Sequence, residues 1–272
     1  MKEKRRNKLL VEICGILLAL LWISPFYLMI VNAFKTKNGI FSNVLGIPQE
    51  WTFENFKQAF IDLDFVSSFG YSIFISVASV GIIVLFSSMA GYALARNKSK
   101  LSGVIFMIFV AAMLIPFQSV MIPLISLFGQ VDMLNPVGLI FMYLGFGSSL
   151  SIFLYHGAMA SIPVSLDEAA TIDGANKWQI FWKIVFPMLK PISVTVMILN
   201  VIWIWNDYLL PSLVLDAETA TIPLKMFFFF GQYTKQWHLA LAGLTIAIIP
   251  VIIVYFIAQK QIIKGVTDGA VK

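Results

Sequence analysis

Long blocks of apolar residues, rather than a polar–apolar alternation, dominate the chain. The blocks lie at about 11–31, 71–95, 104–128, 137–157, 189–210 and 240–260. Each is long enough to cross the ~30 Å hydrocarbon core of a bilayer as a helix that rises ~1.5 Å per residue. The sequence lacks the alternating segments of about ten residues that are typical of a membrane-spanning barrel. The pattern therefore predicts an all-α integral membrane protein, with six transmembrane helices in a single domain over residues 1–272.

Composition supports this class. Apolar residues make up 59% of the chain and charged residues 12%, against roughly 45–50% and about 25% in soluble domains. The net charge is +5, but no basic patch alternates with aromatic residues, so nucleic acid is not an expected partner. Cys14 is the only cysteine, which excludes an intrachain disulfide and a CxxC site. The first block exceeds the length of a signal-peptide core and lacks a cleavage site, so we expect a retained span.

Lysine and arginine divide unevenly between the two sides of the predicted bundle. With the N-terminus inside, the outer loops hold only Lys35, Lys37, Lys57, Lys225 and Lys235, and all other Lys and Arg residues fall inside. This bias predicts that both termini are cytoplasmic. The longest outer loop, residues 32–70, carries Trp51, Phe53, Phe56 and Phe60, so we expect it to pack rather than to float.

The inner segment between the fourth and fifth blocks, residues 161–187, has its own pattern. Pro163 ends the preceding helix. Ser165 and Glu168 have the spacing of a capping box that starts a new helix, and Gly174 fits its C-terminal cap. Four residues of this helix share one face by their spacing, namely Leu166, Ala169, Ala170 and Asp173. Two alanines on that face would let another protein approach closely, although the same pattern also fits an ordinary elbow in which Glu168 only caps.

A second short helix follows. Asn176 is its expected N-cap. One face carries Trp178, Phe181, Trp182 and Val185, and such a helix can lie in the plane of the membrane interface.

The spacing in this segment resembles a known motif. Glu168-Ala169-Ala170, three residues, Gly174, nine residues and Ile184-Val-Phe-Pro187 are similar to the EAA motif of ABC importer permeases, with Phe186 in place of leucine. The string Asp167–Ala175 is similar to the carbohydrate branch, the maltose-permease (MalG-like) subunits. Weaker matches spread over nearly the whole chain, at Trp51–Asn55, Met113–Gln118, Ile122-Pro123, Trp205–Tyr208 and Gly269–Lys272.

The resemblance implies a MetI-like fold, that of the ABC type I importer permeases, in a bacterial or archaeal cell membrane. In that family the EAA segment is the coupling helix, seated in a cleft of a cytoplasmic ATPase subunit. Carried over, Glu168 would be the polar anchor, Ala169 and Ala170 would allow close contact, and Gly174 would permit the turn beside Asp173. The C-terminal residues would also reach the ATPase dimer, namely Gly269, Ala270, Val271 and Lys272, although the family's usual final glycine is absent.

The resemblance also implies partners: a second homologous permease subunit, two copies of an ABC ATPase that carry ATP and Mg²⁺, and an extracellular or periplasmic solute-binding protein, all in membrane lipid. This chain itself contains no G-x-x-x-x-G-K-[ST] string, so we expect no cofactor and no metal in it. The only histidines, His156 and His238, lie near predicted span ends, and no catalytic constellation is visible, so the chain is not expected to be an enzyme.

An ion-coupled secondary carrier is the alternative. Such carriers place ionisable residues near the bilayer midplane, whereas Glu12 and Asp207 lie near span ends here. Sugar recognition uses aromatic faces and hydrogen-bonding side chains. The candidates are Gln118 and Ser119 in span three, Tyr143 in span four, and Asn200, Trp203 and Asn206 in span five. These residues could equally bond neighbouring helices. The spans show no Arg or Lys for a phosphate, which favours a neutral sugar over a solute such as glycerol phosphate.

Overall fold

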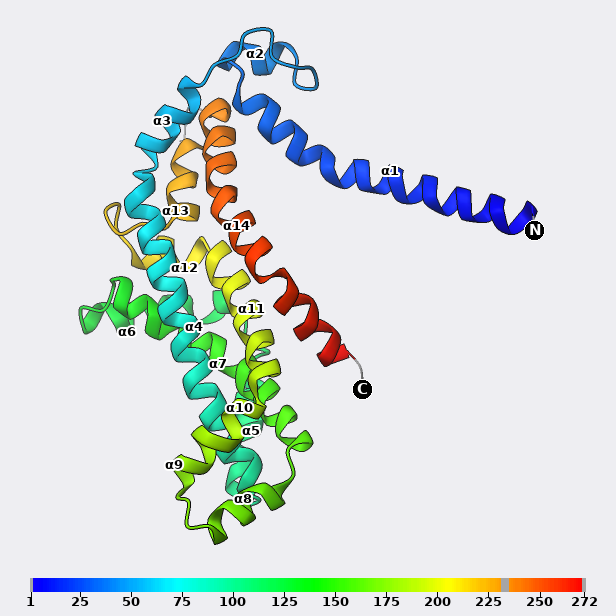
Figure 1. Ribbon diagram of the computed structural model, residues 1–272. Helices are drawn as coiled ribbons and strands as arrows, with labels where there is room; N and C mark the ends of the chain where they lie inside the picture. The colour runs from blue at the N-terminus through cyan, green and yellow to red at the C-terminus, as the bar shows by residue number, and fades with distance from the viewer. Residues whose placement is uncertain (1, 231–234, 271–272) are drawn as a thin grey trace. The chain divides into compact units, whose positions relative to one another are not determined.

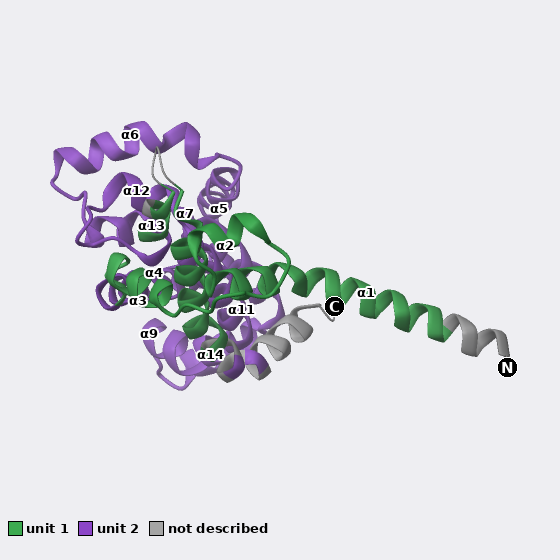
Figure 2. Cartoon of the chain, turned by 90° about the horizontal axis from the view of Figure 1, so that it is seen from above, with its two compact units in different colours: residues 1–65, 225–254 green, residues 66–224, 255–272 purple. Residues whose placement is uncertain are grey.

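The computed structural model is mostly helical over the part of the chain that it describes, which is residues 2–230 and 235–270. Side chains are described for residues 8–227, 229–230, 235–253, 256 and 259. Two compact units emerge, residues 1–65 with 225–254 and residues 66–224 with 255–272, drawn in green and purple in Figure 2. Each unit is described by itself below.

The longest helices, which are drawn in Figure 1, carry four of the six apolar blocks. Three stretches are long and apolar enough to cross a membrane: Lys8–Ala33 in α1 (Lys2–Ala33), Phe65–Arg96, which is α4, and Pro136–Ser161, which begins with α7 (Pro136–Ala158). Two bent helix pairs raise the number to five if each pair is one span. A shorter apolar helix, Trp237–Ile253, is the first part of α14 (Trp237–Ala270). The predicted count of six spans stays a prediction.

The predicted span 104–128 is not one straight helix. The chain forms α5 (Lys100–Ala112) and α6 (Phe117–Gln130), with a bend of 104° between them. Pro116 is the reason, because it has no N–H to continue a helical ladder and lies in the extended region, at φ −69° and ψ 141°. Before it, Met113, Leu114 and Ile115 close tight i→i−3 turns that end α5.

The larger unit is built around α4, α7 and α11 (Lys190–Asn206), with α12 (Leu209–Val214) after it. Small residues allow the helices to approach each other closely. A Cβ at Gly91 of α4 would lie 2.6 Å from Tyr155 Cβ of α7. A Cβ at Gly147 of α7 would lie 2.7 Å from Asn200 Oδ1 of α11. The Tyr155 hydroxyl and Ser193 Oγ, 2.9 Å apart, add a buried polar contact between α7 and α11.

The smaller unit contains α1, α2 (Lys37–Ser42), α3 (Glu54–Asp62), η3 (Phe227–Phe229) and the first part of α14, with α13 (Ile222–Met226) leading into it. The aromatic residues of the outer loop contact other rings, as predicted, although Trp51 and Phe53 remain 59% and 71% exposed. The Phe34 ring lies 5.4 Å from Trp51, 5.2 Å from Phe53 and 4.7 Å from Phe56. By contrast, none of the apolar window of α1 is buried in this chain.

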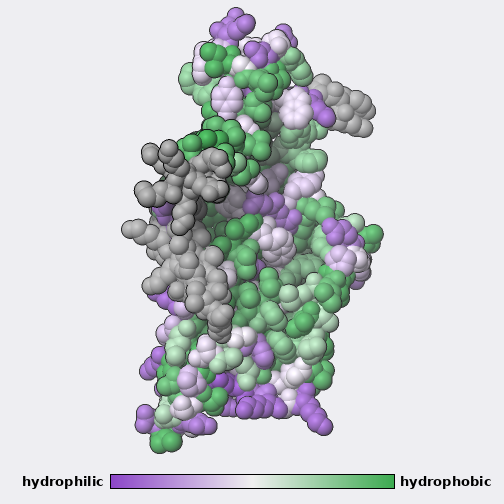
Figure 3. Space-filling view, turned by 90° about the vertical axis from the view of Figure 1, so that its right-hand side faces the viewer, coloured by the Kyte–Doolittle hydropathy of each residue, from purple (hydrophilic) through white to green (hydrophobic). Residues whose placement is uncertain are grey.

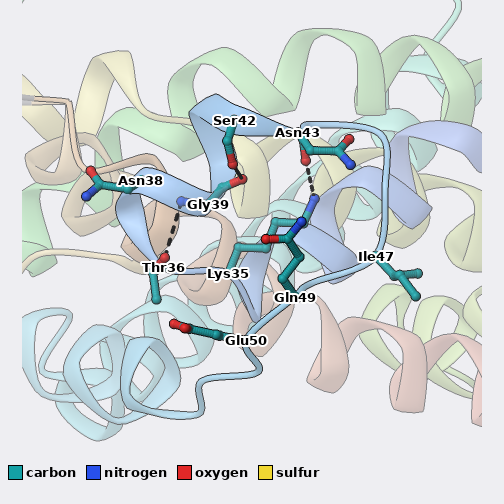
Figure 4. A pocket seen from close by; sticks show the side chains of 9 residues that line it. All are labelled: Lys35, Thr36, Asn38, Gly39, Ser42, Asn43, Ile47, Gln49 and Glu50. Carbon is teal, nitrogen blue, oxygen red and sulfur yellow. Dashed lines mark hydrogen bonds between the residues drawn. The ribbon is translucent and has the colours of Figure 1, made fainter.

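A buried lysine holds the loop around α2. Lys35 is 3% exposed, and its ammonium donates to Asn32 Oδ1 at 2.9 Å and to the Asn43 carbonyl at 2.6 Å. Burial lowers the pKa of Lys35. Lys35, Thr36 and Asn43 help to line a hollow of about 260 Å³. Figure 4 shows the bond from Lys35 to Asn43 and the bond from the Gly39 N–H to Thr36, which caps α2. The loop is therefore fixed by specific bonds.

Candidate functional site

The segment after α7 forms a short exposed helix, as the sequence predicts. After α7 and the turn η1 (Met159–Ser161), Pro163 takes φ −59° and ψ 135°, and α8 runs from Val164 to Ile172. The predicted capping box is wrong: no side chain caps α8, and Ser165 lies inside its first turn. Pro163 already provides the extended residue that precedes a helix, which leaves Ser165 in helical conformation, where it cannot act as N-cap.

The end of α8 agrees with the sequence. Gly174 takes φ +85°, a conformation that is costly for residues with a Cβ. Its N–H donates to the Thr171 carbonyl at 3.0 Å, and the Ala175 N–H donates to the Ala170 carbonyl at 2.9 Å. These two bonds form a Schellman motif. The chain therefore turns sharply back, and Ala175 packs against the same core as Ala170.

The two sides of α8 have different environments. Ala170 is 8% exposed and belongs to the core, whereas Glu168, Ala169 and Asp173 are exposed. The prediction that both alanines are open to another protein is therefore wrong for Ala170, because the returning chain covers it. Ile172 is 86% exposed, an unusual position for a large apolar side chain beside two carboxylates. Figure 3 shows hydrophilic side chains gathered at the lower edge of the view, where α8 lies in Figure 1.

A polar link ties α8 to the end of α4. Arg96 Nε donates to Asp167 Oδ2 at 2.9 Å, and Arg96 Nη2 donates to the Ile162 carbonyl at 3.0 Å and to Asp167 Oδ1 at 3.4 Å. The Tyr92 hydroxyl donates to Asp167 Oδ2 at 3.0 Å. The Arg96 and Asp167 side chains are 16% and 14% exposed. Sequence reasoning missed this link because its partners are 71 residues apart and no local spacing connects them.

A hollow of about 860 Å³ lies beside this link. It is lined by Tyr92, Ala93, Arg96, Asn97, Asp167, Glu168, Thr171, Ile172, Lys177 and Ile180. Charged groups of both signs and exposed apolar atoms meet there.

The second helix starts where the sequence predicts. Asn176 and Gln179 form a reciprocal capping box at the start of α9 (Lys177–Ile180). The π-helical turn η2 (Phe181–Val185) and α10 (Phe186–Met188) follow, and the chain bends by 75° between this segment and α11. The predicted aromatic face is divided: Phe181 is buried, whereas Trp178 is 61% exposed and Trp182 is 40% exposed. The wider π turn shifts the register of the residues that follow it.

Two of the proposed sugar contacts lie together in the bundle. The buried Tyr143 hydroxyl donates to Asp207 Oδ2 at 2.9 Å. The Trp203 ring meets the Tyr143 ring edge to face, with centroids 5.4 Å apart, and Trp203 is 40% exposed. Asp207 lies at the C-cap of α11, and its other oxygen accepts from the Leu209 N–H at 3.0 Å.

The other four candidates are placed differently. Asn200 is buried and donates to Ser151 Oγ at 3.1 Å and to the Val196 carbonyl at 2.9 Å, so it joins α11 to α7. Asn206 is exposed and donates to the Ile202 carbonyl. Gln118 and Ser119 are exposed in the first turn of a different helix, α6.

The C-terminal candidates fall at the limit of the described chain. Gly269 and Ala270 end α14, but their surroundings are not among the described side chains, and Val271 and Lys272 lie outside the described residues. Their contact with an ATPase stays a prediction.

Comparison with known proteins gives consistent matches. Residues 83–268 match the family model described as binding-protein-dependent transport system inner membrane component. The chain is 53% identical over 273 residues, covering all of both chains, to the probable starch degradation products transport system permease protein AmyC of Thermoanaerobacterium thermosulfurigenes. It is 36% identical over 280 residues to the multiple sugar-binding transport system permease protein MsmG of Streptococcus mutans, covering 100% of this chain and 99% of that one.

A solved structure shares the fold. A chain from the crystal structure of a bacterial ABC transporter involved in the import of the acidic polysaccharide alginate aligns with a TM-score of 0.81 and 24% identity, covering 96% of this chain and 98% of that one.

Proposed function

Because the chain belongs to the family of binding-protein-dependent transport system inner membrane components, we propose that it is the permease subunit of an ATP-driven sugar importer that receives force through α8. ATP hydrolysis takes place on separate subunits, and the helices of this chain alternate between inward-open and outward-open arrangements. The N- and C-termini lie in the cytoplasm of a bacterial or archaeal cell, as the distribution of Lys and Arg favours.

The observation that carries the proposal is the combination of exposure and attachment in α8. Its outer side displays Glu168, Ala169 and the 86% exposed Ile172. Its inner side is bound to α4 through Arg96 and Asp167. A nine-residue helix has little stability of its own in water, so these fixed bonds position the outer side. A fixed surface of this mixed character suits docking into an ATPase subunit.

Further partners follow from what this chain leaves uncovered. The apolar window of α1 is not buried by the chain itself, so lipid or a second permease subunit covers it. A solute-binding protein delivers the substrate to the outer loops. In support, one structural neighbour, with a TM-score of 0.64, comes from an alginate ABC transporter in complex with an alginate pentasaccharide-bound periplasmic protein. The ATPase is present in two copies, by the resemblance noted for the EAA segment.

The substrate is a neutral saccharide. Relatives named for the transport of starch degradation products and of multiple sugars support this class. Trp203, exposed beside Tyr143, offers an aromatic face for a sugar ring, and Asp207 can accept hydrogen bonds from hydroxyl groups. Within α4, α5, α6, α7 and α11, lysine and arginine occur only at the helix ends, which disfavours a phosphate-bearing solute.

The test is co-purification of the tagged chain from cells that express the whole transporter. We expect Glu168→Lys and Ile172→Asp each to lose the ATPase while retaining the second permease. Glu54→Lys is the matched control, because Glu54 is an exposed carboxylate in the first turn of another short helix, α3. Retention of the ATPase by both α8 variants, together with ion-driven uptake by this chain alone, would establish a secondary carrier instead.

A separate measurement tests the substrate. In proteoliposomes that contain the assembled transporter and its binding protein, we expect Trp203→Ala to reduce uptake of a labelled maltooligosaccharide while ATP-dependent closure remains. Unchanged uptake would remove Trp203 from the pathway.

A further inference from the structure

We propose that the hydrogen-bonded link of Arg96, Asp167 and Tyr92, here called the α4–α8 link, converts movement of α8 into movement of α4. In this role Arg96 and Asp167 are positioning residues for transport: they contact neither ATP nor sugar, and without them each ATP hydrolysed drives much less uptake. The inference rests on the proposed function, in which α8 docks on an ATPase.

The first argument is that α8 buries little of its own surface. Only Ala170 of this helix is buried, and an alanine provides a small packing contact. Besides its contacts with α9, which follows it in the chain, α8 is held by the hydrogen bonds that Arg96 and Tyr92 donate to Asp167. A push on the outer side of α8 therefore reaches α4 through Asp167.

The geometry of Arg96 suits this task. Its guanidinium reaches Asp167 in the first turn of α8 and also the Ile162 carbonyl, which precedes Pro163. The two contacts lie on either side of the bend that starts α8, so they resist both displacement and rotation of this helix. A guanidinium is a planar, rigid fork, whereas a lysine ammonium is a single point charge and cannot reproduce both contacts.

The surroundings strengthen the bonds. Arg96 and Asp167 are 16% and 14% exposed, so water and salt screen the pair less than they screen an exposed ion pair. Tyr92 lies one helical turn before Arg96 and donates to the same carboxylate oxygen as Arg96 Nε. The Tyr92 ring also lies 5.5 Å from the Phe181 ring in η2, which connects the link to the segment that leads into α11.

α4 is a suitable receiver of the movement. It is one helix of 32 residues without proline, so a displacement at Arg96 passes along its length. Near the same end, Gly91 lies against the backbone of α7 at Tyr155 and His156. Movement of α4 therefore carries α7, the helix on which Tyr143 lies.

The test uses the assembled transporter with its binding protein in proteoliposomes, and measures ATP hydrolysis and saccharide uptake on the same sample. We expect Arg96→Lys and Asp167→Asn to retain the ATPase and its hydrolysis, but to lower uptake per ATP by about tenfold or more, the effect expected from loss of a charge-assisted hydrogen bond. Tyr92→Phe, which keeps the ring contact with Phe181, should lower the ratio less.

Two further variants make the test specific. Exchange of the charges in Arg96→Asp/Asp167→Arg should recover part of the lost coupling, because a pair acts as a unit in a double-mutant cycle. Lys57→Gln breaks the exposed Lys57–Glu54 pair, in which both side chains are 69% exposed, and should leave the ratio unchanged.

The outcomes separate this inference from the proposed function. Wild-type uptake per ATP in Arg96→Lys and Asp167→Asn would overturn the α4–α8 link, as would a charge exchange that is no better than either single variant. Neither result affects the docking of α8, which is judged by ATPase retention in Glu168→Lys and Ile172→Asp.

Discussion

Substitution of Gly91 by alanine tests the close approach of α4 to α7. In the structure, a Cβ at this position would lie 2.6 Å from Tyr155 Cβ, 3.1 Å from the His156 backbone nitrogen and 3.3 Å from the Tyr155 carbonyl carbon. Non-bonded carbon atoms prefer separations of about 3.5–4.0 Å. The two helices must therefore separate by about 1 Å at this point, and backbone atoms cannot rotate away as the end of a side chain can.

The magnitude follows from two opposing effects. Forcing an extra methyl group into a packed contact costs about 1–3 kcal/mol. Alanine in place of a helical glycine returns about 1 kcal/mol through helix propensity. Gly81 is the matched control because it lies in the same helix, and a Cβ there has nothing within 4 Å. Gly81→Ala should thus gain propensity without a clash, and the two variants should differ by about 1–3 kcal/mol of stability.

The assay is thermal unfolding of the purified transporter in detergent, followed by tryptophan fluorescence. A difference of this size corresponds to a separation of several degrees between the two melting temperatures. If Gly91→Ala melts at or above the temperature of Gly81→Ala, α4 and α7 do not approach each other as described. Movement passing from α4 to α7 would then need another route.

Three other substitutions test features of single sites. Gly174→Ala should destabilise the end of α8 by about 1–2 kcal/mol because the residue at this position has a positive φ, and Gly174→Asn should have a milder effect. Amide hydrogen exchange in α8 measures the difference, and equal protection in the two variants would contradict the Schellman turn. Lys35→Met should cost about 1–3 kcal/mol by leaving buried acceptors without a donor, whereas Lys37→Met at an exposed position should stay within ~0.5 kcal/mol in thermal unfolding. Asn200→Leu should lower stability by about 1 kcal/mol while the KM for saccharide stays unchanged, since its amide serves helix packing; a raised KM would return Asn200 to the substrate pathway.

Local signals in the sequence predicted local structure well. Gly174 indicated the end of α8 and Asn176 the start of α9, because each acts on backbone groups within a few residues. The apolar blocks likewise predicted the long helices, since twenty such residues have few alternatives to a bilayer. The sequence offered two candidates for the residue before α8, Pro163 and Ser165, and did not show which one is used. In the structure Pro163 precedes the helix and Ser165 lies within it.

Features that depend on distant residues were not predictable. Arg96 ends one helix and Asp167 begins another, so neither has a neighbour in sequence that indicates its partner. The burial of Ala170 depends on the chain returning after Gly174, which helical periodicity cannot express. The bend of 104° between α5 and α6 has a visible cause in Pro116, but the residue alone does not specify the angle.

The uncovered state of α1 has a practical consequence. Cys14, the only cysteine of the chain, is exposed on this helix, so a nitroxide spin label attaches at one position without prior mutagenesis. Paramagnetic relaxation by dissolved oxygen, which concentrates in the acyl chains, would then measure whether this turn of the helix faces hydrocarbon or another polypeptide. The same label can be followed through the ATP cycle, so that a change in its oxygen accessibility reports when another polypeptide covers this helix.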